Sequence, residues 1–318
     1  MTVSLQHVYD SLANMLSAGV SLKPALLTSV AQGSGALHAA VTAVANVIER
    51  GSSLAAAIAR HPKVFPRLDI AVIEVAELSG RLPEALHALA KWHAMKLHTY
   101  NILKSGLAYP VIVLHAGAFI LQLSLLFQGR TTSEYFFAVF STLFYLYLPA
   151  AAIYFIFKLS KGSSSLQRML DSALLAVPLL GKALHDLAFG RYCFGFLMLY
   201  QCGIPMDKTA GLAAELTGNA TVSAMLAGGV ESVRRGMPVS RGFSPAVPID
   251  FKTLWTTGET AGRLEETLEK LYEDNMESGH NYLRQFARWL PRFVYSICVL
   301  VLLHTSLSRI STSFNYPF

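Results

Sequence analysis

The sequence predicts an all-α, polytopic membrane protein with two repeated cytoplasmic six-helix bundles and three transmembrane helices. Three observations lead to this fold class. Of the 318 residues, 53% are hydrophobic and 14% are charged, whereas about a quarter of the residues in a soluble domain are charged. Three long segments are apolar and almost free of charge. Finally, the phrase E-x-x-G-R-L-x-E-x-L occurs twice.

The repeated phrase indicates a duplicated module. It begins at Glu77 and again at Glu259, and each copy lies in a helical pattern that precedes an apolar segment. A glycine that ends an earlier helix, Gly19, returns as Gly203 at nearly the same offset. Landmarks that keep their order while the offset drifts slightly are typical of a duplication followed by short insertions.

The first module is predicted to be a series of short amphipathic helices. Apolar residues recur at helical spacing, Ser21 and either Ser52 or Ser53 are expected as N-caps, and glycines follow the helices as stops. The predicted helices cover about 5–18, 22–32 and 36–50, a short segment after Ser53, 68–78, and a long helix that opens at Pro83.

The second module repeats this scheme, and neither module shows strand-like alternation of useful length. Its predicted helices run to about 201, over 206–216, from the break at Gly218 to about 236, over 250–260, and from 264 towards the last span. The stretch 238–248 takes the place of the stretch 52–66 of the first module.

Three segments are candidates to cross a bilayer, which takes about 20 apolar residues. The resulting domain prediction is 1–104 for the first cytoplasmic repeat, 105–129 for the first span, 130–134 for a short outer loop, 135–157 for the second span, 158–290 for the second repeat, 291–310 for the third span and 311–318 for an outer tail.

Positive charge sets the orientation. Lysines and arginines flank the cytoplasmic ends of all three predicted spans, while the 130–134 loop holds only Arg130. The positive-inside rule then places the N-terminus in the cytoplasm and the C-terminus on the outer side of the membrane. The net charge of +6 favours anionic membrane lipids as partners rather than nucleic acid, because no compact basic and aromatic module is present.

The repeated phrase has a structural interpretation as a helix corner. Gly80 ends one helix, and Glu84 lies in the first turn of the next, where the helix dipole favours an anion. Glu77, at a helix end, needs a partner; a salt bridge to Arg81 is the favoured interpretation, with a docking surface or a divalent-cation site as alternatives. The candidate partner-contact or corner residues are Glu77, Gly80, Arg81, Glu84, Glu259, Gly262, Arg263 and Glu266.

Two histidines, His115 and His304, fall inside predicted spans. An ionisable residue in a membrane is a functional candidate, and a proton relay would be one role. Neither has an acidic partner within a span, so neutral histidines that hydrogen-bond between helices are the favoured interpretation.

No motif for catalysis is found. The sequence lacks G-x-x-x-x-G-K-[ST], H-E-x-x-H and G-x-S-x-G. Cys193, Cys202 and Cys298 form no C-x-x-C pair and are expected to be reduced thiols. We therefore predict no catalytic, cofactor-binding or metal-ligating residue, no cofactor, and no enzymatic activity.

The order of modules and spans, with their motifs, resembles the type II secretion system F family (GspF/PilC). The matching phrases are Ala18-Gly19-Val20, Arg50-Gly51, Glu77 to Leu82 and Tyr109-Pro110 in the first repeat, and Cys202-Gly203-Ile204, Arg235-Gly236, Glu259 to Leu264 and Pro291 in the second. Two departures are the missing N-terminal extension and Leu290, which stands where an acidic residue is often found.

This resemblance implies a non-enzymatic inner-membrane platform for type IV pilus biogenesis or type II protein secretion. Its expected partners are a cytoplasmic assembly ATPase, major and minor pilins, other inner-membrane components and further copies of itself, as a dimer or a larger homo-oligomer. A transporter or channel subunit is the alternative. It is disfavoured because no predicted span carries Asp, Glu or Lys, and three spans leave little room for a substrate path.

Overall fold

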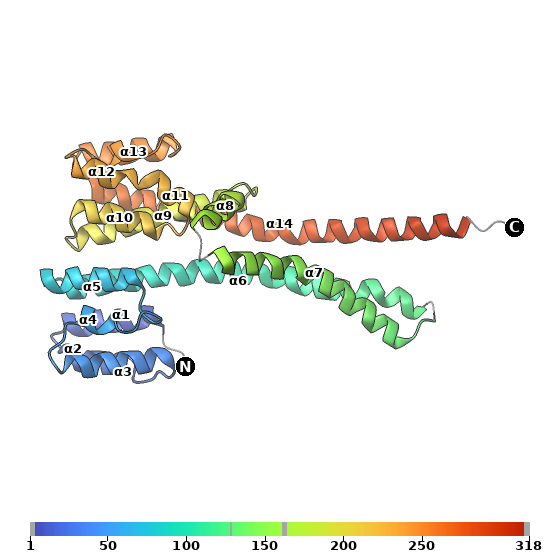
Figure 1. Ribbon diagram of the computed structural model, residues 1–318, viewed down its shortest axis with the longest axis horizontal. Coiled ribbons are helices and arrows are strands. Elements are labelled where there is room, and N and C mark those ends of the chain that lie inside the picture. The colour runs from blue at the N-terminus through green and yellow to red at the C-terminus, as the bar shows by residue number, and fades with distance from the viewer. Residues whose placement is uncertain (1–3, 128, 161–163, 315–318) are drawn as a thin grey trace. The chain divides into compact units, whose positions relative to one another are not determined.

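The computed structural model describes residues 4–127, 129–160 and 164–314, and every regular element among them is a helix (Figure 1). This confirms the predicted all-α class. In chain order the elements are α1 (Leu5–Ser17), α2 (Leu22–Ser29), α3 (Ala36–Ile48), α4 (Leu54–Ile58), α5 (Arg67–Ser79), α6 (Leu82–Phe127), α7 (Thr132–Ser160), α8 (Ser164–Leu175), α9 (Leu180–Gln201), α10 (Met206–Leu216), α11 (Ala220–Leu226), α12 (Gly228–Arg234), the 3₁₀ helix η1 (Val239–Gly242), α13 (Ile249–Thr260) and α14 (Leu264–Phe314).

The chain forms two compact units, and each is discontinuous in sequence. The first unit comprises Met1–Thr99 and Leu184–Ser278, so it contains both copies of the repeated phrase. The second comprises Tyr100–Ala183 and Gly279–Phe318. The long helices α6 and α14 contribute residues to both units.

The N-terminal half of the first unit is a chain of helices in which each helix packs on the next, from α1 to α5. Ser21 lies at the predicted N-cap of α2, although its side chain makes no capping hydrogen bond. The Ser4 hydroxyl accepts a hydrogen bond from the His7 amide at 3.3 Å at the start of α1, and Gly19 follows its end with φ of 81°. The core is apolar and includes Leu12, Ile73 and Leu86, each at most 2% exposed.

The C-terminal half of the first unit is organised around Trp255 on α13. The indole is fully buried and lies 5.0 Å from the Phe196 ring and 5.2 Å from the Phe243 ring, centroid to centroid. One predicted helix is wrong in detail: the stretch ending at Gly236 is two helices, α11 and α12. Helix α12 begins where a Cβ on Gly228 would lie 2.1 Å from the Gly242 carbonyl oxygen, so this contact with η1 requires glycine.

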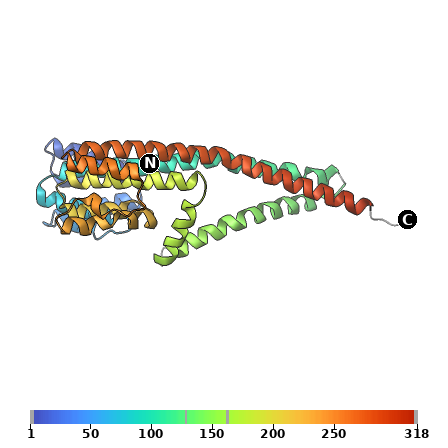
Figure 2. The same ribbon diagram turned by 90° about the horizontal axis from the view of Figure 1, so that it is seen from above.

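In the second unit, α6 turns back into α7 through Gly129, which has φ of 73° (Figure 1). Polar groups connect the two helices: the Gln122 side-chain amide donates to the Thr142 hydroxyl at 3.1 Å, and the Tyr135 hydroxyl donates to the Phe119 carbonyl at 3.2 Å. Helix α14 continues without a break to Phe314 (Figure 2). The predicted outer tail 311–318 is thus helical as far as Phe314, and its last four residues lie outside the described part of the chain.

Among the described residues, α6 is the one continuous helix that is long and apolar enough to cross a membrane. Residues Met169–Leu175 of α8 and helix α9 would together be long and apolar enough if they counted as one span, but the chain bends by 114° between them. The apolar face of α9 is also buried in the first unit. The second and third predicted spans lie within the continuous helices α7 and α14. Their crossing of a membrane stays a prediction.

Candidate functional site

The two copies of the repeated phrase form the same helix corner. Gly80, after α5, and Gly262, after α13, have φ of 69° and 68°, which is the left-handed region that glycine adopts without strain. The next amide in each copy bonds back across the helix end, from Arg81 to the Ala76 carbonyl at 3.0 Å and from Arg263 to the Gly258 carbonyl at 2.9 Å. The corner geometry expected from the sequence is therefore present twice.

The two glutamates that open the phrase cap a neighbouring helix. The carboxylate of Glu77 accepts backbone hydrogen bonds from Leu54 at 2.6 Å and Ala55 at 2.9 Å, at the start of α4. Glu259 does the same for η1, accepting from Val239 at 2.5 Å and Ser240 at 3.1 Å. The favoured salt bridge within the corner is thus wrong, since these carboxylates are engaged elsewhere.

Electrostatics explains this pairing. Glu77 and Glu259 lie near the C-terminal ends of α5 and α13, where a carboxylate is disfavoured. Each is also placed at the N-terminal end of another short helix, whose unpaired N–H groups attract an anion. Charged caps of this kind replace the intrinsic stability that a helix as short as α4, with five residues, lacks.

The arginines of the corners have different partners. The Arg81 guanidinium donates to the carbonyl of Gln201, the last residue of α9, at 3.2 Å. It thereby joins the two halves of the first unit, which also meet where the Trp92 and Phe194 rings stack with centroids 6.0 Å apart. Arg263 instead pairs with Glu266, three residues further on α14.

A groove of about 270 Å³ lies beside the second corner, between α13 and α14. Leu254 and Ala261 contribute apolar surface to it, and Arg263 and Lys270 contribute positive charge. Among the described residues, no group of three His, Cys, Asp or Glu side chains is placed to hold a metal ion. The cation-site interpretation of the corner has no support in this geometry, because the glutamate oxygens are occupied by N–H donors.

The sequence reasoning missed a buried polar cluster in the first repeat. The Asp69 side chain on α5 is fully buried and accepts a hydrogen bond from the Tyr9 hydroxyl at 2.8 Å. The same oxygen, Oδ2, lies 2.9 Å from Nε2 of His93 on α6, while Oδ1 has no hydrogen-bond partner among the described residues. Burial, and then the neighbouring Asp69, raise the pKa of Tyr9 well above its usual value, so the phenol stays protonated.

A comparison of the repeats would have revealed this cluster. When the two copies of the phrase are aligned without gaps, Asp69 corresponds to Phe251. Phe251 is itself buried and packs on Trp255 at 5.8 Å between ring centroids. The first repeat thus buries a carboxylate where the second buries an aromatic ring, and a charged residue at a position that is apolar in the other copy was the available signal.

The predicted intramembrane histidine His115 does connect two helices. Its Nδ1 lies 2.7 Å from the Val111 carbonyl, and its Nε2 lies 2.9 Å from the Tyr147 hydroxyl on α7. Since the carbonyl can only accept, Nδ1 carries the proton and Nε2 accepts from the phenol in the neutral ring. These contacts agree with the expected hydrogen bonding of His115 between helices, whereas the side chain of His304 lies outside the described residues.

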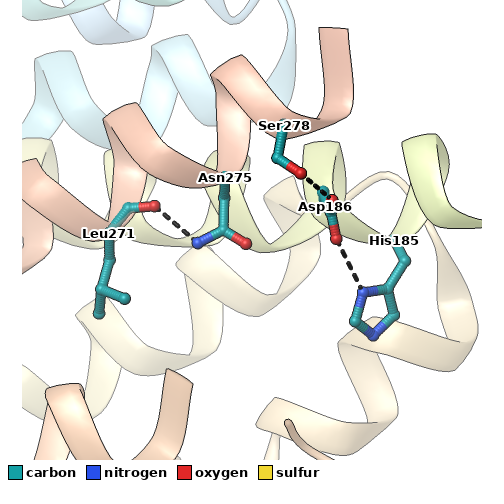
Figure 3. A network of polar contacts seen from close by, with 5 residues as sticks. All are labelled: His185, Asp186, Leu271, Asn275 and Ser278. Atoms are coloured by element: carbon teal, nitrogen blue, oxygen red, sulfur yellow. Dashed lines mark hydrogen bonds and ion pairs between the residues drawn. The ribbon is translucent and has the colours of Figure 1, made fainter. Parts of the chain in front are cut away.

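A polar network joins α9 to α14 in the second repeat (Figure 3). The Ser278 hydroxyl donates to Asp186 at 2.6 Å, and Nδ1 of His185 lies 3.3 Å from the other oxygen of the same carboxylate. Nucleophilic catalysis would require the histidine to contact the serine. Here the Asp186 carboxylate lies between the serine and the histidine, so the network connects α9 to α14 and does not pair the histidine with the serine.

The two described cysteines do not have the environment of reactive thiols. Cys193 and Cys202 are buried and unpaired by disulfides. Burial raises the pKa of Cys202 to about 11 and raises that of Cys193 as well. Both therefore remain thiols, and thiols are poor nucleophiles.

Comparison with known proteins points to one family. Residues 8–127 match the family described as "Type II secretion system (T2SS), protein F". The type 4 fimbrial assembly protein PilC of Pseudomonas putida is 26% identical, with 91% of this chain and 78% of that protein aligned. The type II secretion system protein F of Pseudomonas aeruginosa is 23% identical over 84% of this chain and 71% of its own length.

A relative from a third species aligns over a similar share of the chain. The type IV pilus assembly protein PilC of Thermus thermophilus is 24% identical, over 82% of this chain and 69% of its own. These alignments extend across both repeats, which is why they cover far more than the 8–127 match. Residues 8–127 thus match the type II secretion system protein F family, and relatives that align with most of the chain are named for type IV pilus assembly or type II secretion.

Proposed function

We propose that this chain is the inner-membrane platform protein of a type IV pilus or type II secretion machine. The observation that carries the proposal is the alignment of 82–91% of the chain with relatives named for pilus assembly or type II secretion. Its chemistry is in keeping with a scaffold: the polar clusters of the described residues satisfy helix ends and join helices.

The proposed topology has two cytoplasmic six-helix bundles and three transmembrane helices, with the N-terminus inside and the C-terminus outside. Its support is the apolar length of α6, the continuity of α7 and α14, and the asymmetry of positive charge around the predicted spans. The domain limits are those predicted from the sequence, from 1–104 for the first repeat to 311–318 for the tail.

The proposed partners are the assembly ATPase, the pilins, other inner-membrane components and further copies of the chain. Each corner opens a long helix, with 46 residues in α6 and 51 in α14. At 1.5 Å per residue these helices are roughly 70 Å and 75 Å long. A displacement imposed on a corner would therefore be carried along a rigid helix, which supports coupling of the ATPase to pilin extraction.

Genetic complementation tests the platform role. Deletion of this gene should abolish the surface fibre or the secreted product, and the wild-type gene should restore it. A deletion strain with normal pili and normal secretion would refute the proposal.

A binding experiment tests the ATPase contact at the corners. The charge reversals are placed at Glu84 and Glu266, whose side chains are exposed. Glu77 and Glu259 are left unchanged because their carboxylates accept hydrogen bonds from backbone amides. We expect the double variant Glu84→Arg and Glu266→Arg to bind the co-expressed ATPase more weakly, while reversal of Glu134 on the predicted outer side has no effect. Equal affinity of all variants would exclude the corners from the interface.

A further inference from the structure

Helix α8 exposes an apolar stripe. Met169, Leu170, Ala173 and Leu174 recur at the spacing of one helical face. The Met169 side chain is 64% exposed, and Ala173 is exposed as well. Helix α8 contacts α7 as well, and Leu170 and Leu174 are half-buried.

The apolar surface continues into the turn that joins α8 to α9, which we call the elbow (residues 175–181). Ala176, Val177 and Pro178 are exposed, with Val177 at 37%. The chain reverses sharply here, with 114° between the two helices (Figure 2). A loop at the protein surface that faces water is normally polar, whereas residues 173–180 contain no polar side chain.

One residue of the elbow, Leu179, has a backbone conformation that is strained for leucine and that glycine adopts without strain. Leu179 has φ of 64°, and every other described residue with positive φ is a glycine. The turn is tight, because the Gly181 amide donates to the Val177 carbonyl at 2.7 Å and a Cβ at Gly181 would lie 2.0 Å from the Leu175 carbonyl oxygen. A strained apolar side chain at a turn indicates that the side chain itself has a role.

Basic residues outnumber acidic ones in the parts of the second unit that adjoin this segment in sequence or lie on α14. Residues 135–183 contain four basic residues and one acidic residue, Asp171. Within the second unit, Lys182 is exposed, with its Nζ 5.6 Å from the centroid of the Tyr282 ring on α14. Residues 279–292 of α14 contribute exposed arginines at 284, 288 and 292 and no acid. An apolar face bordered by basic groups is typical of a helix that lies at an anionic lipid interface.

We propose that α8 and the elbow form an interfacial anchor that binds the anionic lipid of the cytoplasmic leaflet, with Met169 and Val177 inserted among the acyl chains. The occupant is a lipid surface because the segment closely follows α7, a predicted span, and because basic residues outnumber acidic ones in residues 135–183, with Lys182 exposed beside the elbow. The anchor rests on the proposed membrane function. It adds a second attachment of the C-terminal repeat, independent of the spans.

Site-specific fluorescence on the full chain tests this anchor. Cys298→Ser leaves two native cysteines, Cys193 and Cys202, which are at most 2% exposed and will not react with a label. In this background Met169→Cys and Val177→Cys each receive a polarity-sensitive fluorophore. The chain is then reconstituted into vesicles of phosphatidylcholine, with or without phosphatidylglycerol, and quenched by lipids that carry a nitroxide at a shallow or a deep position.

Two control positions have similar side chains. Ile249→Cys on α13, where the side chain is 79% exposed, should report water, and Ile120→Cys on α6, 63% exposed, should report the bilayer core. We expect labels at positions 169 and 177 to shift to the blue and to lose most of their intensity to the shallow quencher, more so with phosphatidylglycerol. The label at 249 should remain unquenched.

The remaining outcomes separate the anchor from the proposed function. If labels at 169 and 177 behave like the label at 249 while the label at 120 is quenched, the anchor is refuted and the membrane protein stands. If the label at 120 is also unquenched, the membrane placement fails and the anchor fails with it. Equal quenching at 169 and 177 with and without phosphatidylglycerol would overturn the selection of anionic lipid.

Discussion

Replacement of Asp69 should destabilise the first repeat more than any other single change in its polar cluster. The buried carboxylate accepts from the Tyr9 hydroxyl at 2.8 Å and lies 2.9 Å from Nε2 of His93. The His93 side chain is 11% exposed and that of Asp69 is not exposed at all, so water does not replace the lost contacts. Asp69→Ala would leave both partners with an unsatisfied polar group.

The expected loss follows from the two contacts. A hydrogen bond to a charged group contributes about 1.5–3 kcal/mol, and removal of one member of a buried pair costs about 3–5 kcal/mol. The Oδ1 atom of Asp69 has no partner among the described residues, so the wild type already bears part of the cost of burying this charge. We therefore expect the lower end, about 3 kcal/mol, of a total stability of roughly 5–15 kcal/mol.

The assay is urea unfolding of the detergent-solubilised chain, followed by tryptophan fluorescence, to which the neighbouring Trp92 contributes. The matched control removes the whole cluster with Tyr9→Phe, Asp69→Leu and His93→Leu together. A buried ionic cluster replaced by apolar groups is often close to neutral, so this variant should lie within about 2 kcal/mol of the wild type. A loss of less than about 1 kcal/mol for Asp69→Ala, or an equal loss for the triple variant, would refute the reasoning.

The same titration checks four further expectations. Glu77→Ala and Glu259→Ala should each cost about 2 kcal/mol, because two amides lose their acceptor; a loss much smaller than this would mean that water caps those helices as well. Gly80→Ala should cost about 1–2 kcal/mol through its positive φ alone, since nothing lies within 4 Å of the added Cβ; an unchanged midpoint would contradict this. Tyr192→Phe should be neutral or stabilising, because the buried Tyr192 hydroxyl has no partner among the described residues, and a clear loss would reveal one. The raised pKa of Tyr9 predicts that stability is retained below pH about 10 and falls above it by about 1.4 kcal/mol per pH unit, until the folded-state pKa is reached; Tyr9→Phe should flatten this decline in an alkaline series.

Features that depend on neighbouring residues were predictable from the sequence. The corner at Gly80 follows from a glycine at a helix end and an acid in the next first turn, and both signals lie close together in the chain. A cap at Ser52 or Ser53 was predicted on the same basis, and in the structure the Ser53 hydroxyl accepts from the Ala56 amide at 3.2 Å. The duplication raised the reliability of the corner prediction, since the same phrase occurs in both repeats.

Features that depend on distant pairs were not predictable. Glu77 meets its partners on α4 across 22 and 23 residues, and Tyr9 meets Asp69 across 60 residues. Arg81 was the nearest opposite charge to Glu77 along the chain, but the fold supplies two backbone donors instead. In the second repeat, the contact between Gly228 and Gly242 breaks a predicted helix in a way that no local propensity indicates.

The discontinuity of the first unit has a consequence for biosynthesis. Its two parts, Met1–Thr99 and Leu184–Ser278, are separated in the sequence by Tyr100–Ala183, which belongs to the second unit. At a translation rate of roughly 5–20 residues per second, the second part begins to leave the ribosome about 4–17 s after the first. Throughout that interval the face of Trp92 that later stacks on Phe194 has no partner. We therefore expect a chaperone to bind the nascent first repeat. The first unit can be completed only after α7 has been synthesised.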